Sequence, residues 1–256
     1  MLIKDLVVLG RACPEPLSDG RVTVCMAGWS DTKGFMRLYP TRKDMSFHQW
    51  DIIEVDVEQN AKDTRLESWK ITGAKSEWDN LASKVKVVSH MSSVDTRRNL
   101  IGNLTDSCVN VVNEAKRSLG IIKPSILRTH FQDNKSYGQL FQQAMPGFTE
   151  LDDAMVKRDF PKEPRITYRC PDCQTASKQH DQQVLEWGFY EWMRKNPDNI
   201  DQVWKNADIG EADRDHYFLV GNQAAHRNSF MIISVLRFPK GDIVSPMFPR
   251  RKIPDD

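Results

Sequence analysis

Cys170-Pro-Asp-Cys173, followed by His180, is the segment whose residue types and spacing most clearly indicate chemistry. Two thiolates separated by two residues can bind one tetrahedral cation from a tight turn, because both sulfur atoms then face the same hollow. The imidazole of His180 is close enough in the sequence to supply a third ligand. We therefore predict a zinc site with a structural role and with Cys170, Cys173 and His180 as ligands.

The fourth ligand of this site is not evident from the sequence, and His216, His226 and Asp181 are the candidates. A dithiol redox pair and a metal-free turn are the alternative interpretations of the Cys-x-x-Cys pair. Five cysteines in a chain of this length argue against a disulfide scaffold. The three remaining cysteines are isolated in the sequence and are predicted to be small buried apolar residues: Cys13, Cys25 and Cys108.

Asp181, Glu186 and His226 are the candidates for a catalytic role, although the sequence leaves open whether there is a catalytic site. A metal-dependent hydrolase needs two or more carboxylates that converge on a divalent cation. The alternative is that Asp181 caps a helix and that Glu186 lies on its solvated face. His226 belongs to a polar loop between two apolar runs, where binding residues are often found.

Aromatic and basic residues are interleaved in the first part of the chain, which is a pattern typical of nucleic-acid binding. Rings can stack on bases while cationic side chains bind phosphates, and the alternative is that the aromatic residues form the core of a small domain. The residues predicted to contact nucleic acid are Trp29, Arg37, Arg42, Lys43 and Arg65.

Short β-branched and aromatic runs separated by turn residues predict a small β-barrel in residues 1–75. Ile53, Val55 and Val57 alternate with acidic residues, as expected for a strand with one buried face. We expect an OB-like or SH3-like barrel, because closing the sheet removes its exposed edges.

Helices are expected to follow the barrel in residues 76–164, including a helix over 95–119 that is broken near Gly102 and a proline-rich linker over 121–165. A zinc-knuckle α/β module is expected over 165–240, with a strand at 165–169, helices at 181–195 and 199–207, and paired strands at 217–221 and 230–236. Residues 241–256 are predicted to form a loose tail. The predicted fold class is thus α+β.

The formal net charge is +1, with 36 basic and 35 acidic residues, so any binding of nucleic acid must rely on a local patch. The apolar run near the N-terminus is too short for a signal peptide, and no run approaches the length of a membrane helix. We therefore expect a cytoplasmic protein with no membrane partner.

The strings VCMAGWSDTKGFMRLYP and FHQWDIIEVDVEQNAKDTRLESWKI in the first half, and YRCPDCQTASKQHDQQVLEWGFYEWMRK and DHYFLVGNQAAHRNSFMIISVLRFP in the second, resemble a family of uncharacterised prokaryotic and phage-related proteins. The resemblance implies nucleic-acid handling, in a mobile-element or phage-defence context. We expect a nucleic-acid-binding or adaptor protein with a structural zinc site. The alternatives are a metal-dependent nuclease or hydrolase, and a non-catalytic assembly subunit that binds a protein partner or a second copy of itself.

Overall fold

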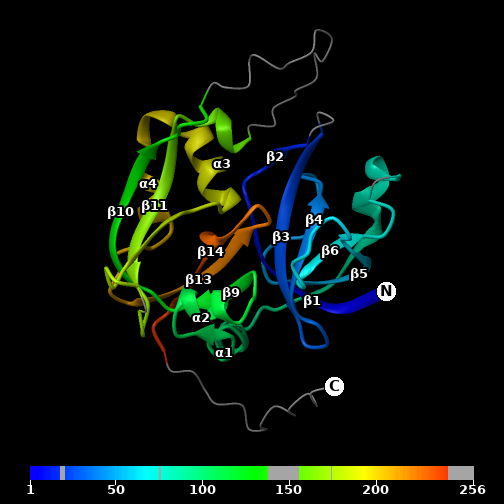
Figure 1. Cartoon of the computed structure of the whole chain (residues 1–256), viewed down its shortest axis with the longest axis horizontal. Helices are drawn as coiled ribbons and strands as arrows, with labels where there is room; N and C mark the ends of the chain where they lie inside the picture. Colours follow the sequence, from blue (N-terminus) through cyan, green and yellow to red (C-terminus); the bar gives the residue numbers. More distant parts are fainter. Residues whose placement is uncertain (18–20, 75, 138–155, 174, 242–256) are drawn as a thin grey trace.

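The computed structural model describes residues 1–17, 21–74, 76–137, 156–173 and 175–241, and within these ranges its strands form three sheets (Figure 1). The predicted tail beyond 241 and residues 138–155 of the predicted linker lie outside the described residues. The first sheet contains seven of the described strands: β1 (Leu2–Arg11), β2 (Glu15–Pro16), β3 (Val22–Ser30), β4 (Gly34–Thr41), β5 (Asp51–Gln59), β6 (Ser68–Ile71) and β7 (Val85–His90).

Five strands of this sheet close into a barrel in the order β1-β3-β4-β6-β5, because β5 also pairs with β1. Ile53, Val55 and Val57 of β5 are at most 1% exposed, whereas the acidic residues between them face outward or are only partly covered. The predicted alternation is confirmed and the barrel encloses one apolar core. β7 extends the sheet beyond the barrel by pairing with β5.

The remaining elements form two smaller sheets with short helices around them. They are η1 (Trp78–Lys84), α1 (Val94–Asn103), β8 (Thr105–Asp106), α2 (Val109–Glu114), β9 (Leu119–Ile122), β10 (Ser125–Asp133), η3 (Lys157–Asp159), β11 (Lys162–Arg169), β12 (His180–Gln183), α3 (Trp187–Lys195), η4 (Pro197–Asn199), α4 (Gln202–Asn206), β13 (Arg214–Gln223) and β14 (His226–Pro239). The sheet orders are β10-β11-β12 and β14-β13-β9-β8. The described part of the chain combines three largely antiparallel sheets with few helices, in broad agreement with the α+β prediction.

The helical interpretation of the middle of the chain is wrong in two places. The helix expected over 95–119 ends at Asn103, close to the predicted break, and β8 separates it from α2. The linker expected over 121–165 contains the second half of β9 and all of β10. Leu119–Ile122 is fully buried and pairs with β13, so these apolar residues gain more from sheet pairing than a loop could give them.

The helix expected over 181–195 begins only at Trp187, because the first residues of that range form β12. Asp181 therefore pairs with Thr167 across the sheet and does not cap a helix. The side chains of Gln182 and Gln183 bond the hydroxyl groups of two buried tyrosines, which holds this polar strand inside the protein. These hydrogen bonds link strands and helix and cannot be inferred from periodicity.

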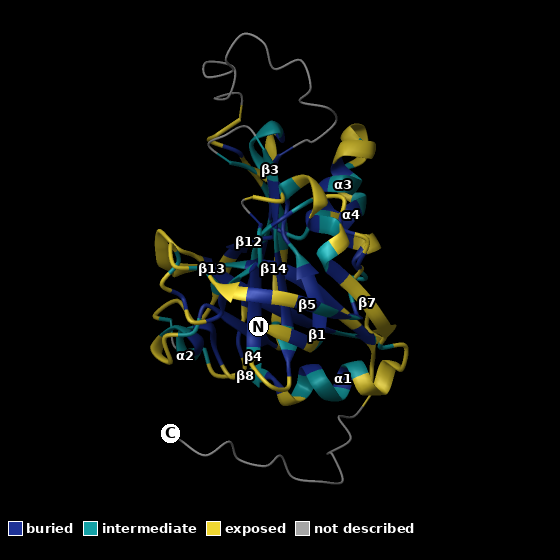
Figure 2. Cartoon of the chain, turned by 90° about the vertical axis from the view of Figure 1, so that its right-hand side faces the viewer, coloured by how far each residue is buried: buried dark blue, intermediate teal, exposed yellow. Residues whose placement is uncertain are grey.

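A second apolar core lies between the barrel and the four-stranded sheet. Val7 and Leu9 of β1 pack in it together with Leu119 and Ile121 of β9. Figure 2 shows the buried parts of β1, β4 and β14 gathered in the middle of the molecule. Gly10 marks the closest approach, since a Cβ atom there would lie 2.7 Å from the Cβ of Ser234. The two halves of the chain thus share one core.

Buried polar groups join the same two halves. The Glu67 carboxylate, from the barrel side, accepts hydrogen bonds of 2.8 Å and 2.9 Å from the backbone N–H and the hydroxyl of Ser118. The Arg37 guanidinium donates to the Ser118 carbonyl oxygen at 3.1 Å. Arg65 donates to the Asn222 carbonyl oxygen at 2.5 Å. Each of these groups depends on its partner because buried polar groups are costly when unpaired.

We found no described helix with both the length and the hydropathy that are needed to cross a bilayer.

Replacing Glu67 by Ala should lower the free energy of unfolding by about 2–4 kcal/mol, because two buried donors of Ser118 lose their acceptor. Urea unfolding followed by tryptophan fluorescence measures this change. Glu58→Ala is the matched control: its carboxylate is exposed and pairs with Lys70 at the surface, so its loss should cost less than about 1 kcal/mol. Equal effects of the two variants would contradict a structural role for the Glu67 contact.

Candidate metal centre

The predicted ligands lie at the end of the β11–β12 pair where a turn connects the two strands. Cys170 directly follows β11, and β12 begins at His180. The antiparallel register places His180 opposite Tyr168, so the turn between the strands returns the imidazole to the level of the cysteine pair. The rings of His180 and Tyr168 lie 5.4 Å apart, and Tyr168 in turn packs edge-on against Phe218 in the core. The imidazole is therefore supported by buried aromatic residues.

Cys108 reaches the same place from another part of the chain. It is the residue that precedes α2, and its carbonyl oxygen accepts hydrogen bonds from the first turn of that helix. The backbone N–H of Asp172 donates to the Ser107 carbonyl oxygen at 3.1 Å, and the N–H of Val109 bonds the Cys170 sulfur. These backbone contacts hold the cysteine turn against the start of α2.

The ligand atoms of Cys108, Cys170, Cys173 and His180 all lie within 4.8 Å of one another. The Cys108 Sγ and the His180 Nε2 are 3.5 Å apart. In a tetrahedral zinc site with Zn–S bonds of about 2.3 Å, neighbouring sulfur atoms lie about 3.8 Å apart. Small side-chain movements would thus bring the four atoms into zinc coordination geometry.

The electrostatics of the cluster also fit a bound cation. Burial raises the pKa of Cys170, and the nearby sulfur atoms of Cys108 and Cys173 add to the increase. At Cys173, burial is outweighed by hydrogen bonds from Thr175 and neighbouring groups, so its pKa is lowered. Burial lowers the pKa of His180, which favours the neutral imidazole that a metal requires. A divalent cation would stabilise the Cys170 thiolate, which this buried site otherwise disfavours.

The structure therefore brings together the three predicted ligands and adds Cys108, which the sequence placed among the apolar residues. Among the described residues, these four form the only group of three or more His, Cys, Asp or Glu side chains that could hold an ion. His216, His226 and Asp181 are thus not the fourth ligand. His216 bonds the Ala207 carbonyl oxygen instead. The one signal in the sequence was the incomplete ligand count, which left a place for a distant cysteine.

The three catalytic candidates have separate surroundings. The Asp181 carboxylate accepts a hydrogen bond from Arg165 at 3.2 Å. The Glu186 carboxylate accepts from the Val235 backbone at 2.6 Å, and burial raises the pKa of this acid. His226 is exposed at the start of β14. No metal-holding group among the described residues includes these side chains.

Two of the predicted nucleic-acid-binding residues, Arg37 and Arg65, are buried, with 5% and 7% exposure. They bond carbonyl oxygens at the junction described above and do not face solvent. Arg42 is partly exposed and forms an ion pair with Asp44. Lys43 is exposed. Trp29 is partly buried, packs edge-on against Phe35 at a centroid distance of 5.1 Å, and donates to Asp31.

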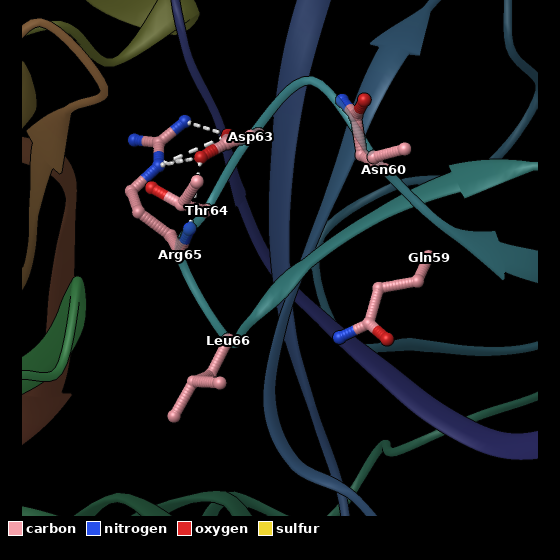
Figure 3. Close-up of a pocket in the computed structure, with 7 residues that line it drawn as sticks. Gln59, Asn60, Asp63, Thr64, Arg65 and Leu66 are labelled. Carbon is pink, nitrogen blue, oxygen red and sulfur yellow. Dashed lines mark hydrogen bonds and ion pairs between the residues drawn. The ribbon is translucent and has the colours of Figure 1, made fainter.

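A hollow of about 320 Å³ lies beside Arg65, in the loop between β5 and β6 (Figure 3). Its charged lining residues are Asp63 and Arg65, which point toward each other and form an ion pair of 2.5 Å. Although burial opposes it, hydrogen bonding from Arg65 and Ser68 lowers the pKa of Asp63 to about 2. Because the two charges neutralise each other, this hollow is not a site for a charged ligand.

Cys108→Ser should abolish stoichiometric zinc binding, because removal of one thiolate leaves three ligands of a tetrahedral site. Elemental analysis of the purified protein should find about one zinc per chain in the wild type and much less in this variant. Cys25→Ser is the control. Because Cys25 lies outside the cluster, this variant protein should retain the metal. Full zinc content in Cys108→Ser would rule out the four-ligand site.

Two family models match the chain in succession. The first, "Domain of unknown function (DUF8758)", matches residues 3–103, and the second, "Domain of unknown function (DUF8757)", matches residues 105–252. No curated protein matches the sequence. All four residues of the metal cluster fall within the second match, which covers more than half of the 256 residues. The chain thus belongs to the DUF8757 family and carries a DUF8758 domain before it.

Proposed function

We propose that this protein is a nucleic-acid-binding or adaptor protein with a structural zinc centre formed by Cys108, Cys170, Cys173 and His180. The observation that supports the centre is the gathering of these four ligand atoms within 4.8 Å. Three thiolates and one imidazole form a donor set that zinc prefers, because soft sulfur ligands select against magnesium and calcium.

A structural role is favoured because four protein ligands complete a tetrahedral zinc site. A catalytic zinc site keeps one position open for water or substrate. In this protein zinc would connect the turn between β11 and β12 to the start of α2, and so act as a zinc knuckle. We do not extend the proposal to a hydrolase, since Asp181 and Glu186 each accept hydrogen bonds from other groups.

The nucleic-acid part of the proposal is supported by the distribution of charge. The formal net charge of +1 requires a local basic patch. Arg42 and Lys43 supply basic groups on the barrel, and further arginines lie on the three-stranded sheet beside the metal cluster. We also propose that the barrel has an OB-like or SH3-like fold. The sequence resemblance further implies that the protein acts in a mobile-element or phage-defence context.

Zinc removal should destabilise the protein strongly, because metal binding contributes directly to the free energy of folding. A thiol-reactive agent with a chelator should lower the melting temperature by roughly 10 °C or more, given that about 1 kcal/mol corresponds to 2–4 °C at this size. Differential scanning calorimetry before and after treatment measures the shift. Once excess dithiothreitol has released the agent from the cysteines, zinc but not magnesium should restore it. An unchanged melting temperature after complete removal of zinc would exclude a structural role.

Binding to nucleic acid should be measurable and sensitive to salt. We expect fluorescence anisotropy with labelled single-stranded DNA, single-stranded RNA and duplex DNA to detect binding at 20 mM salt. The logarithm of the affinity should fall linearly with the logarithm of the salt concentration, with a slope of about −2 to −4, as expected for a few phosphate contacts. Absence of binding to all three probes at low salt would remove this function.

A further inference from the structure

One face of the three-stranded sheet is covered by the core, and the opposite face is rich in arginine. In β11, Ile166 and Tyr168 are fully buried and pack in the apolar core with α3 and α4. Side chains alternate along a strand, so Arg165, Thr167 and Arg169 lie on the other face. Figure 1 shows β10 and β11 side by side at the edge of the molecule, on the far side from the barrel.

The neighbouring strands add to this outer face. Arg128 of β10 and Asp181 of β12 flank Thr167, so the three residues form one row across the sheet. His130 flanks Arg165 in the next row, whereas Gln183 on the other side of Arg165 is buried and bonds Tyr190. We use the name arginine face for the surface formed by Arg128, His130, Arg165, Thr167 and Arg169.

Acidic side chains on this face do not balance its arginines. Asp181 accepts from Arg165, whose guanidinium also bonds the Asp181 carbonyl oxygen at 2.8 Å, so that arginine is held in place. Arg128 and Arg169 are exposed and form neither an ion pair nor a side-chain hydrogen bond with any residue in the described ranges. The arginine face therefore carries an excess of cationic groups in contact with solvent.

Two polar atoms of the arginine face lack partners within the described part of the chain. The Thr167 hydroxyl and the His130 Nδ1 are both buried and make no hydrogen bond. Thr167 is 7% exposed and lies between Arg128 and Asp181. A buried hydroxyl without a partner costs about 1–3 kcal/mol. An oxygen of a ligand bound at Arg128 would offer the missing acceptor once that exposed side chain moves aside.

The spacing of the cations suits a polyanion better than a single phosphate. Residues two apart along a strand are separated by about 6.6–6.8 Å, and neighbouring strands by about 4.8 Å. Arg165 and Arg169 are thus about 13 Å apart along the strand, too far for one phosphate group, and Arg128 lies on the neighbouring strand about 8 Å from Arg169. Leu127, which is 46% exposed next to Arg128, offers an apolar surface on which an unpaired base can rest.

We propose that the arginine face binds the sugar-phosphate backbone of single-stranded nucleic acid, with Arg128 and Arg169 as the principal phosphate contacts. This inference rests on the nucleic-acid binding proposed above and assigns it to a surface that the sequence did not indicate. Arg169 directly precedes Cys170, and Asp181 directly follows His180. The zinc centre would therefore hold the end of the arginine face in place.

The double variant Arg128→Ala/Arg169→Ala tests the proposal, with Lys4→Ala/Lys62→Ala as a control that removes two exposed charges from the first sheet and its loops. Anisotropy titrations with single-stranded DNA and RNA compare both with the wild type. The arginine variant should lose at least tenfold in affinity at 50 mM salt. The slope of the logarithm of its affinity against the logarithm of the salt concentration should become less negative by about 1.4, which is 0.7 for each of the two lost phosphate contacts. The lysine variant should remain within about twofold of the wild type.

Asp181→Asn should act in the opposite direction and raise the affinity at low salt, since it removes the acidic group that repels phosphate. Zinc content and melting temperature should be unchanged in all three proteins, which separates an effect on binding from unfolding. If the wild type binds no probe, both the proposed function and this inference fail. If the wild type binds and the arginine variant binds equally well, or if the lysine control loses as much, the function stands and the arginine face is wrong.

Discussion

The packing of β1 against β14 and of β4 against β9 is the contact on which the rest of the structure depends. Val7 and Leu9 leave the barrel core and enter a second core with Leu119 and Ile121. Because β9 lies between β8 and β13, this contact fixes the four-stranded sheet relative to the barrel. Apolar burial supplies most of the free energy that holds the barrel against the four-stranded sheet. The hydrogen bonds of Ser118 with Glu67 and Arg37 fix how the two are aligned.

The candidate metal centre extends this arrangement to the three-stranded sheet. Cys108 belongs to the short connection between β8 and α2, next to the four-stranded sheet, whereas its three partners belong to the β11–β12 hairpin. Coordination would thus add to the apolar contacts and the backbone hydrogen bonds that already join these two sheets. The barrel and the four-stranded sheet form the scaffold. The β11–β12 hairpin is attached to this scaffold and presents charged groups on its outer face.

Strands with one wet face, and the apolar runs at 217–221 and 230–236 on either side of a polar loop, could be predicted from the sequence. A short apolar strand next to a helix and a polar buried strand could not. The alternation of Ile53, Val55 and Val57 located β5, since burial on one side leaves a direct pattern. Leu119–Ile122 is buried on both sides, so its residues carry no period and resembled the end of a helix. β12 was missed because its glutamines are polar yet buried, and only their tyrosine partners explain this.

The same contrast applies to the candidate site. Cys170, Cys173 and His180 are close in the sequence, so local spacing was enough to group them. Cys108 fitted the helical spacing of Leu100 and Leu104, and only long-range strand pairing brings it near the other ligands. Arg37 and Arg65 illustrate the reverse error: composition cannot distinguish a guanidinium in solvent from one that bonds buried carbonyl oxygens.

The wide separation of Cys108 and Cys170 in the sequence would make coordination by all four residues a late event in folding. These two ligands are 62 residues apart, and the entropic cost of bringing them together falls on the polypeptide unless the sheets have already assembled. The hairpin alone, as it leaves the ribosome, offers a cation only a partial set of ligands. High-affinity capture of an ion would therefore report that β8 and the β11–β12 hairpin have reached their native arrangement.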